Sequence, residues 1–173
     1  MYWFTADEHY YHSNIIKFCN RPFSSVIEMN EEIIRRNNEV VENNDIVVHA
    51  GDFAFKSSHE SVVKLIKQLK GIHIFVRGSH DKWLNDRSHE IWEINIKGIY
   101  VVVCHYAMRV WPKSHFNSIL LYGHSHGGLE PIGKSYDVGV DSNNFYPYSF
   151  EQIKDIMKHR PNNFNYVKER RSE

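Results

Sequence analysis

Cysteine and long apolar runs are both scarce in this sequence. Two cysteines, Cys19 and Cys104, are too few for a disulfide framework and are typical of a reducing compartment. The longest apolar run, residues 99–104, has six residues, far below the roughly 20 that a helix needs to span a bilayer. Asp7 and Glu8 stand where a signal peptide would carry basic and apolar segments. We therefore expect a soluble, cytoplasmic protein that inserts into no membrane.

The sequence also has no net charge, because its 21 Lys and Arg residues balance its 21 Asp and Glu residues. A formal charge of +0 argues against binding long nucleic acid or an anionic membrane by bulk electrostatics, although a small phosphorylated ligand stays possible. The length of 173 residues predicts a single domain over 1–173 with a polar tail from about residue 162, and it leaves homo-oligomerisation open. Against this plain background the sequence holds 12 histidines.

Short apolar runs alternate with amphipathic helical patterns, which predicts an α/β layered fold. The longest helical pattern covers about residues 26–43, and Ser149 with Gln152 resembles a capping box at the start of a last helix. Strands are predicted at residues 2–5, 45–50, 72–77, 92–96, 99–104, 118–122 and 136–140, and a further helix at 62–69.

Residues of the types that bind metals follow five of the predicted strands. In open α/β sheets, functional sites form beyond the carboxyl ends of the strands, because the loops converge there. Imidazole together with carboxylate suits Zn, Fe, Ni, Co or Mn better than Ca. Each group alone is a weak indicator, but their joint occurrence predicts one metal site. Its members are Asp7 with His9, Asp52, His80 with Asp81, His105, and His124 with His126.

The order of these groups resembles the calcineurin-like metallophosphoesterases, in particular their small bacterial and phage members. The motifs that carry the resemblance are Asp7-Glu8-His9, Gly51-Asp52, Gly78-Ser79-His80-Asp81, His105 and Gly123-His124-Ser125-His126. Residues 12–23, 104–111 and 137–147 are also similar, so the resemblance covers nearly the whole chain. The fold that it implies is a four-layer αββα sandwich, in which two mixed β-sheets are flanked by helices and the site lies where the sheets meet.

The resemblance also implies a centre of two divalent metal ions. Two cations roughly 3.5–4 Å apart would lower the pKa of a bridging water, so that a metal-bridging hydroxide attacks phosphorus. Mn is the first candidate, with Fe, Ni, Co and Zn as alternatives. One ion would be held by Asp7, His9, Asp52 and His126, and the other by Asp52, His105, His124 and the residue at position 79.

Position 79 departs from the family's Gly-Asn-His-Asp pattern, because Ser79 replaces the asparagine. The asparagine supplies a neutral carbonyl oxygen to the second metal, whereas a serine hydroxyl is a shorter and weaker donor. We therefore expect lower affinity at the second metal position than at the first. The next residue, His80, resembles the family's non-ligand histidine, which would stabilise the transition state or protonate the leaving group, with Asp81 orienting its ring.

Residues outside the motifs are candidates for substrate contacts. Arg109 is the first candidate for a phosphate contact, and Arg21 is either a second one or part of a surface turn. His12 either fixes its loop or touches the substrate. Trp111 and Phe116 either stack on a nucleobase or pack a loop.

The function favoured by these motifs is a dinuclear metal-dependent phosphoesterase, foremost a phosphodiesterase that hydrolyses small or nucleotide phosphoesters. A phosphomonoesterase or a protein phosphatase would use the same motifs, since diester preference depends on what fills the pocket beyond the metals. A non-catalytic binding module on a degenerate phosphoesterase scaffold is the third interpretation, and only Ser79 supports it.

Overall fold

The first β-sheet combines three strands from the first half of the chain with one late strand. β1 (Tyr2–Thr5), β2 (Ile46–His49) and β3 (Ile72–Phe75) run parallel, in the order β3-β2-β1. β8 (Tyr148–Ser149) pairs antiparallel with β1 and makes the sheet mixed. Because the three parallel strands point the same way, the loops that leave their carboxyl ends gather at one edge of the sheet.

The second β-sheet is built from consecutive strands and is also mixed. β4 (Ile91–Ile96) and β5 (Ile99–Cys104) form an antiparallel hairpin. β6 (Ile119–Tyr122) and β7 (Ser135–Asp137) then follow parallel to β5. β5 and β6 therefore deliver their following loops to the same edge of the molecule as the first sheet does.

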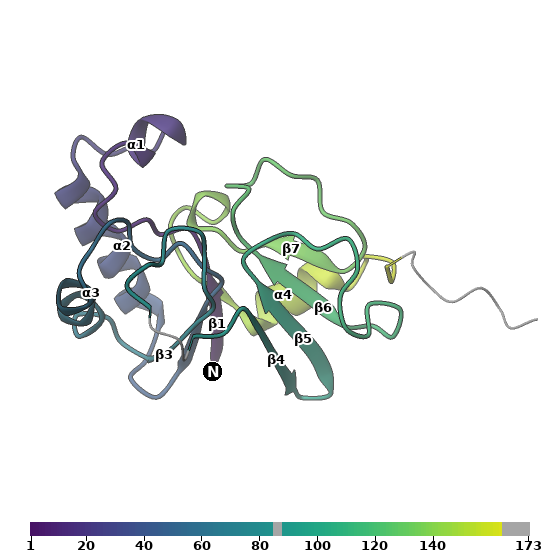
Figure 1. Cartoon of the computed structure of the whole chain (residues 1–173). Helices are drawn as coiled ribbons and strands as arrows, with labels where there is room; N and C mark the ends of the chain where they lie inside the picture. The colour runs from purple at the N-terminus through teal and green to yellow at the C-terminus, as the bar shows by residue number, and fades with distance from the viewer. Residues whose placement is uncertain (85–87, 164–173) are drawn as a thin grey trace, which may run out of the picture.

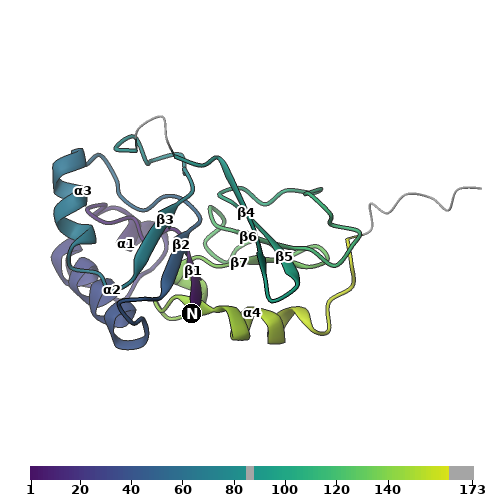
Figure 2. The ribbon, with the colours of Figure 1, turned by 90° about the horizontal axis from the view of Figure 1, so that it is seen from below.

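Helices flank the sheets. α1 (Ile15–Phe18), α2 (Val26–Val40) and α3 (His59–Ile66) lie together on the outer side of the first sheet (Figure 1). α4 (Phe150–Met157) runs beside both sheets, as the turned view in Figure 2 shows, and packs into the core that they share. Its predicted capping box is present, since the Ser149 hydroxyl accepts from the Gln152 N–H and the Gln152 side chain accepts from the Ser149 N–H.

The main hydrophobic core lies between the two sheets. Phe4 and Val48 from the first sheet, Val103 and Leu121 from the second, and Ile153 from α4 are each 0% exposed. Such burial is the principal source of stability, at about 1.5–3 kcal/mol for each large apolar side chain. The core therefore clamps the two sheets together and fixes the edge at which their loops meet.

A loop between β5 and β6 covers the outer face of the second sheet. Trp111 lies in this loop, is 4% exposed, and packs with Val102 and Leu120. Its indole Nε1 donates to the Ser118 hydroxyl at 3.0 Å. Of its two predicted roles, Trp111 therefore has the loop-packing one, whereas Phe116 in the same loop is 74% exposed.

The structure, a computed structural model, describes residues 1–84 and 88–163, and most of the predicted elements are present there. The predicted α/β fold of two mixed sheets flanked by helices is confirmed. α1 and β8 were not predicted, because elements of four and two residues are too short to show a periodicity. The predicted polar tail lies outside the described residues from 164 onward. Within the described ranges, no helix has the length and apolar character needed to cross a membrane.

Candidate metal centre

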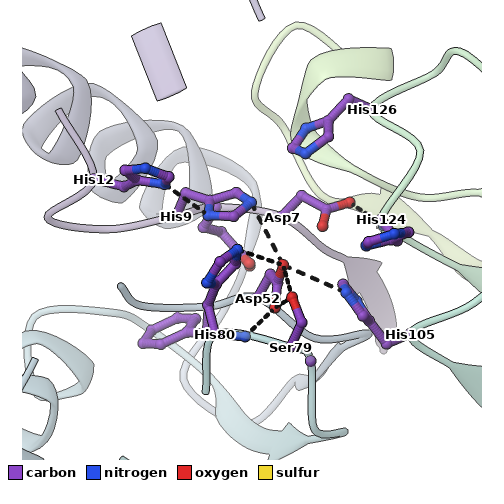
Figure 3. Close-up of polar contacts among 12 residues, drawn as sticks. Asp7, His9, His12, Asp52, Ser79, His80, His105, His124 and His126 are labelled. Carbon is purple, nitrogen blue, oxygen red and sulfur yellow. Dashed lines mark hydrogen bonds and ion pairs between the residues drawn. The ribbon is translucent and has the colours of Figure 1, made fainter. Parts of the chain in front are cut away.

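The predicted metal ligands converge at the edge where both sheets end (Figure 3). They follow β1, β2, β5 and β6, and the loops that carry them are joined directly. The His124 N–H donates to Asp7 Oδ2 at 2.8 Å, and His105 Nδ1 lies 2.9 Å from the Ala50 carbonyl oxygen. These contacts connect residues of different sheets, so the inter-sheet core determines how the ligands are placed.

Among the described residues, four groups of possible metal-binding atoms have their atoms within 4.8 Å of one another, and they overlap at His9, Asp52 and His126. Two of the four contain only predicted metal ligands and have no residue in common. The first ligand set comprises Asp7, His9 and His126, and the second ligand set comprises Asp52, His105 and His124. Asp52 lies between them, because its Oδ2 is 3.7 Å from His9 Nε2 and 3.4 Å from His105 Nε2. One carboxylate is therefore within reach of both sets.

Several buried atoms at this edge lack a hydrogen-bond partner among the described residues. They include Asp7 Oδ1, His9 Nε2 and His105 Nε2. Leaving a buried polar atom unsatisfied costs about 1–3 kcal/mol, so native proteins rarely do so without a reason. A divalent transition metal accepts electron pairs from carboxylate oxygen and imidazole nitrogen. The residues present therefore fit such ions.

Burial and neighbouring charges shift the pKa values of the ligand residues. Burial lowers the pKa of His9 to about 3, which keeps its imidazole neutral, the form that binds metals. Burial also raises the pKa of Asp7 well above its usual range, and the charges of Asp137 and Asp52 raise it further. Burial alone would raise the pKa of Asp52 as well, but the adjacent His105 imidazole and the hydrogen bond from the His80 backbone N–H outweigh it and hold that pKa below its usual range. A cation would offset the repulsion among these carboxylates.

The ligand residues adopt an unusual backbone conformation. Asp7, His9, Asp52, His124 and His126 have φ of 57°, 53°, 56°, 69° and 48°. This left-handed region is unfavourable for residues other than glycine and is concentrated at functional sites. Backbone hydrogen bonds between loops hold it, since Asp7 N donates to Gly51 O and His9 N donates to Asp52 O, both at 3.0 Å.

Gly78 permits a close approach between its own loop, which follows β3, and the Asp52 loop, which follows β2. A Cβ atom at Gly78 would lie 2.2 Å from the backbone nitrogen of Asp52. Any other residue at position 78 would therefore displace the Asp52 loop.

An ion pair supports the first ligand set from behind. Asp141 accepts a hydrogen bond from His126 Nδ1 at 2.8 Å and two from Arg21, through Nε and the terminal nitrogen Nη2, each at 2.8 Å. Arg21 also donates to the backbone carbonyl oxygens of Asp7 and Glu8, at 2.6 and 2.9 Å. We call Arg21 and Asp141 the clamp. Sequence reasoning missed Asp141, whose only signal was its place in the similar segment 137–147.

The prediction that Arg21 contacts a substrate phosphate is corrected by this geometry. The Arg21 side chain is 0% exposed, and its donors are committed to Asp141 and to backbone carbonyl groups. It cannot reach the pocket without breaking the clamp. Its guanidinium fork serves to fix the loop that carries the first ligand set.

The second ligand set has a more open surrounding. His124 is exposed, and Tyr106, 49% exposed, packs against the rings of His105 and His124 at centroid distances of 4.8 and 4.9 Å. The Ser79 hydroxyl donates to both carboxylate oxygens of Asp52, at 3.1 and 3.3 Å. The structure therefore places Ser79 on the carboxylate shared by both sets.

His80 faces the pocket from the other side of Asp52. Its side chain is 39% exposed, its Nε2 lies 3.9 Å from Asp52 Oδ2, and its backbone N–H donates to Asp52 Oδ1 at 2.8 Å. This position leaves the imidazole accessible to a bound molecule.

Asp81 has a different role from the predicted one. It is 1% exposed, and its carboxylate accepts from the backbone N–H groups of Gly78 and residues 52–54 and from the Trp83 indole. These donors turn the carboxylate into the protein, so Asp81 ties the loops after β2 and β3 together and does not orient the His80 ring.

The fold places the two remaining candidates for substrate contacts, His12 and Arg109, at different cavities. His12 lines an open pocket of about 390 Å³ that also contains His9, Asp52, His80 and the His124–His126 loop. Its Nδ1 lies 3.2 Å from His9 Nδ1, so His12 is both a neighbour of a ligand residue and part of the pocket wall. Arg109 lines a different cavity, of about 380 Å³, because its loop turns over the outer face of the second sheet. The predicted contact of Arg109 with phosphate at the metal pocket is therefore corrected.

Comparison with known proteins agrees with this arrangement. The family model of the calcineurin-like phosphoesterases matches residues 2–172. The uncharacterized protein MJ1445 of Methanocaldococcus jannaschii is 32% identical over 161 residues, which cover 88% of this chain and 89% of that protein. The crystal structure of AQ665, a protein of unknown function from Aquifex aeolicus, shares the fold with a TM-score of 0.72 at 24% identity, covering 90% of this chain and 98% of that chain. Since the family match spans nearly the whole sequence, this chain belongs to the calcineurin-like phosphoesterase family.

Proposed function

We propose that this protein is a dinuclear metal-dependent phosphoesterase, and specifically a phosphodiesterase for small or nucleotide phosphoesters. The observation that carries the proposal is the pair of ligand sets that share Asp52, with unpartnered donor atoms of Asp7, His9 and His105 buried beside it. Membership of the phosphoesterase family makes hydrolysis of a phosphoester the chemistry that such a centre serves.

The first ligand set with Asp52 would hold one divalent ion, and the second ligand set the other, with Mn as the first candidate. When bound, two such ions act as Lewis acids that polarise a phosphoryl oxygen and make a bound water a better nucleophile. The clamp keeps the His126 imidazole in a fixed orientation through its Nδ1. Fixing a ligand histidine through its second nitrogen is a common way to strengthen metal binding.

His80 is the residue that we assign to proton transfer. Its half-exposed imidazole lies beside Asp52 and opens to the pocket, where it can donate a proton to a leaving oxygen or a hydrogen bond to the phosphoryl group. Asp81 acts as a positioning residue, because it holds the loop that carries His80 against the Asp52 loop.

The shape and charge of the protein support a small diester as the substrate. The pocket is open and has a volume of about 390 Å³, which leaves room for organic groups on both sides of a phosphorus atom. The formal charge of +0 supplies no extended attraction for long nucleic acid. We also propose that the chain acts in the cytoplasm, since Cys19 and Cys104 are both free thiols.

An activity screen with metal analysis tests the proposal. The protein loaded in turn with Mn, Ni, Co and Zn is assayed on bis-p-nitrophenyl phosphate and p-nitrophenyl phosphate, and its bound metal is counted. We expect two equivalents of metal, faster diester hydrolysis, and a loss of about 10²–10⁴ in kcat for His80→Ala. The exposed His159, which lies beyond α4, provides a matched control variant, His159→Ala.

Other results of the screen would support a different function for this protein. Faster monoester hydrolysis would favour a phosphomonoesterase or protein phosphatase. Intact substrates with every metal, together with no bound metal, would favour a binding module on a degenerate scaffold.

A further inference from the structure

One wall of the metal pocket is apolar and aromatic. Besides the candidate metal ligands and His80, the pocket is lined by His12, Ile15, Phe18 and Phe55, together with the polar Asn14. Phe18 belongs to α1, and Phe55 lies in the loop after β2. Figure 3 shows His12 on the side of His9 that is turned away from His105 and His124. We call His12, Phe18 and Phe55 the aromatic wall.

The rings of the aromatic wall contact one another and continue to His80. The His12 ring stacks on Phe55 with centroids 3.8 Å apart and an interplanar angle of 13°. Phe55 meets the His80 ring edge-on at 5.0 Å, and Phe18 meets His12 edge-on at 6.3 Å. A continuous aromatic surface therefore leads from the proposed proton donor to the rim of the pocket.

Phe18 is the ring of the wall that remains most open. It is 72% exposed, whereas His12 is 8% exposed and Phe55 is half-buried. The short α1 helix holds Phe18 at the pocket because Ile15, one turn earlier, is buried in the core beneath it. His12 and Phe55 thus form a fixed backing, and Phe18 offers a ring face to a ligand.

The lining also limits what kind of group can be recognised there. In the described part of the chain, no Lys or Arg side chain lines this pocket. Lys56 lies beside the wall without lining the pocket, with its Nζ 5.1 Å from the centroid of the Phe55 ring. A planar uncharged ring would find a stacking surface, and such stacking does not depend on which base is present.

We propose that the aromatic wall is a subsite for the planar nucleobase of a nucleoside phosphoester, next to the phosphorus held at the metal centre. This inference rests on the proposed function and names its substrate class: nucleoside phosphodiesters in preference to those that lack a base. It assigns Phe18 as a specificity-determining residue.

Binding and hydrolysis together test this subsite. Calorimetry on the Mn-loaded protein compares AMP with ribose 5-phosphate, which lacks only the base. Kinetics compare thymidine 5′-p-nitrophenyl phosphate with methyl p-nitrophenyl phosphate, which share one leaving group. For Phe18→Ala we expect AMP binding to weaken about 5- to 20-fold more than ribose 5-phosphate binding, with a similar fall in the kcat/KM ratio of the two diesters. Ile27→Ala is the matched control, since Ile27 is 66% exposed on α2 and does not line the pocket.

The outcomes separate this inference from the proposed function. Hydrolysis of both diesters with a ratio that Phe18→Ala leaves unchanged would overturn the subsite and keep the function. Base-dependent AMP binding that Phe18→Ala abolishes, without hydrolysis of either diester, would keep the subsite and overturn the function. If Phe18→Ala weakens the binding of AMP and of ribose 5-phosphate by the same factor, the subsite would also be overturned, because such a result would indicate a change at the metal centre itself.

Discussion

The two ligand sets lie side by side, with Asp52 of the second set also near His9 of the first, yet they are supported differently. In the first set Asp7 and His9 are buried, at 0% and 2% exposure, and the half-buried His126 is fixed by the clamp. The second set includes the exposed His124, with a serine hydroxyl at position 79 where the family pattern places an amide oxygen. The comparison teaches that the side chains of the first set are held in place by residues behind them, whereas those of the second set depend on the residues directly beside them.

The reason for the difference is where each set lies between the sheets. His126 follows β6 in the second sheet, whereas Arg21 and Asp7 come from segments that follow β1 in the first sheet. The clamp therefore joins the two sheets behind the first set. The second set lies on the side of Asp52 where the loops after β5 and β6 meet solvent, and aromatic contacts of Tyr106 take the place of ion pairs. Unequal metal affinity is the expected result.

The largest effect is expected from changing the residue that both sets share. Asp52→Asn keeps the shape of the side chain but removes the charge between His9 and His105. We expect both metal equivalents to be lost at micromolar metal and kcat to fall at least about 10³-fold, since metal ions contribute several kcal/mol to such reactions. Metal analysis after gel filtration and an assay on bis-p-nitrophenyl phosphate measure this, with the exposed Asp155→Asn as the control. Loss of only one equivalent of bound metal would show that Asp52 contributes to metal binding at one ligand set alone.

An intermediate effect is expected from weakening the clamp. Asp141→Asn removes the charge that Arg21 and His126 Nδ1 share. We expect Mn(II) affinity to fall about 10- to 100-fold at the first set and to stay unchanged at the second, because outer partners of ligand histidines typically have effects of this size. Calorimetric titration resolves the two affinities. A parallel fall at both sets would mean that the clamp stabilises the whole edge and not one half of it.

The smallest effect is expected at position 79. Ser79→Asn would place an amide oxygen beside Asp52 and would raise the affinity of the second set up to about tenfold, comparable to one added polar contact. The same Mn(II) titration should then show the two affinities moving closer together. If Ser79→Asn changes neither the metal affinities nor the turnover, then Ser79 does not weaken metal binding at the second set. The expected difference in affinity between the two sets would then need another explanation.

Much of the fold could be predicted from the sequence because burial leaves a local pattern. The apolar run at residues 99–104 and the capping pair Ser149 and Gln152 identified β5 and the start of α4 without any knowledge of their neighbours. The candidate ligand residues could be proposed for the same reason, since each follows a strand whose own residues define it. Asp7, for example, comes directly after β1.

The roles of the supporting residues could not be predicted in this way. Arg21 and Asp141 are 120 positions apart in the sequence, and only the packing of the two sheets brings them into contact. Arg109 had the residue type and spacing of a phosphate contact, but its loop folds over the outer face of the second sheet. Asp81 had the position of an orienting partner, but backbone donors from the Asp52 loop turn its carboxylate inward.

Local pattern was enough to define the α/β alternation, the order of the ligand residues and the family resemblance, because hydrophobic periodicity and motif spacing are properties of neighbouring residues. The folded arrangement was needed to define which ligands group together, that Arg21 is a clamp and not a substrate contact, and that an aromatic wall borders the pocket. These features depend on the directions of side chains in strained loops, such as the left-handed backbone at Asp7 and His9, and that backbone is held by hydrogen bonds to distant parts of the chain.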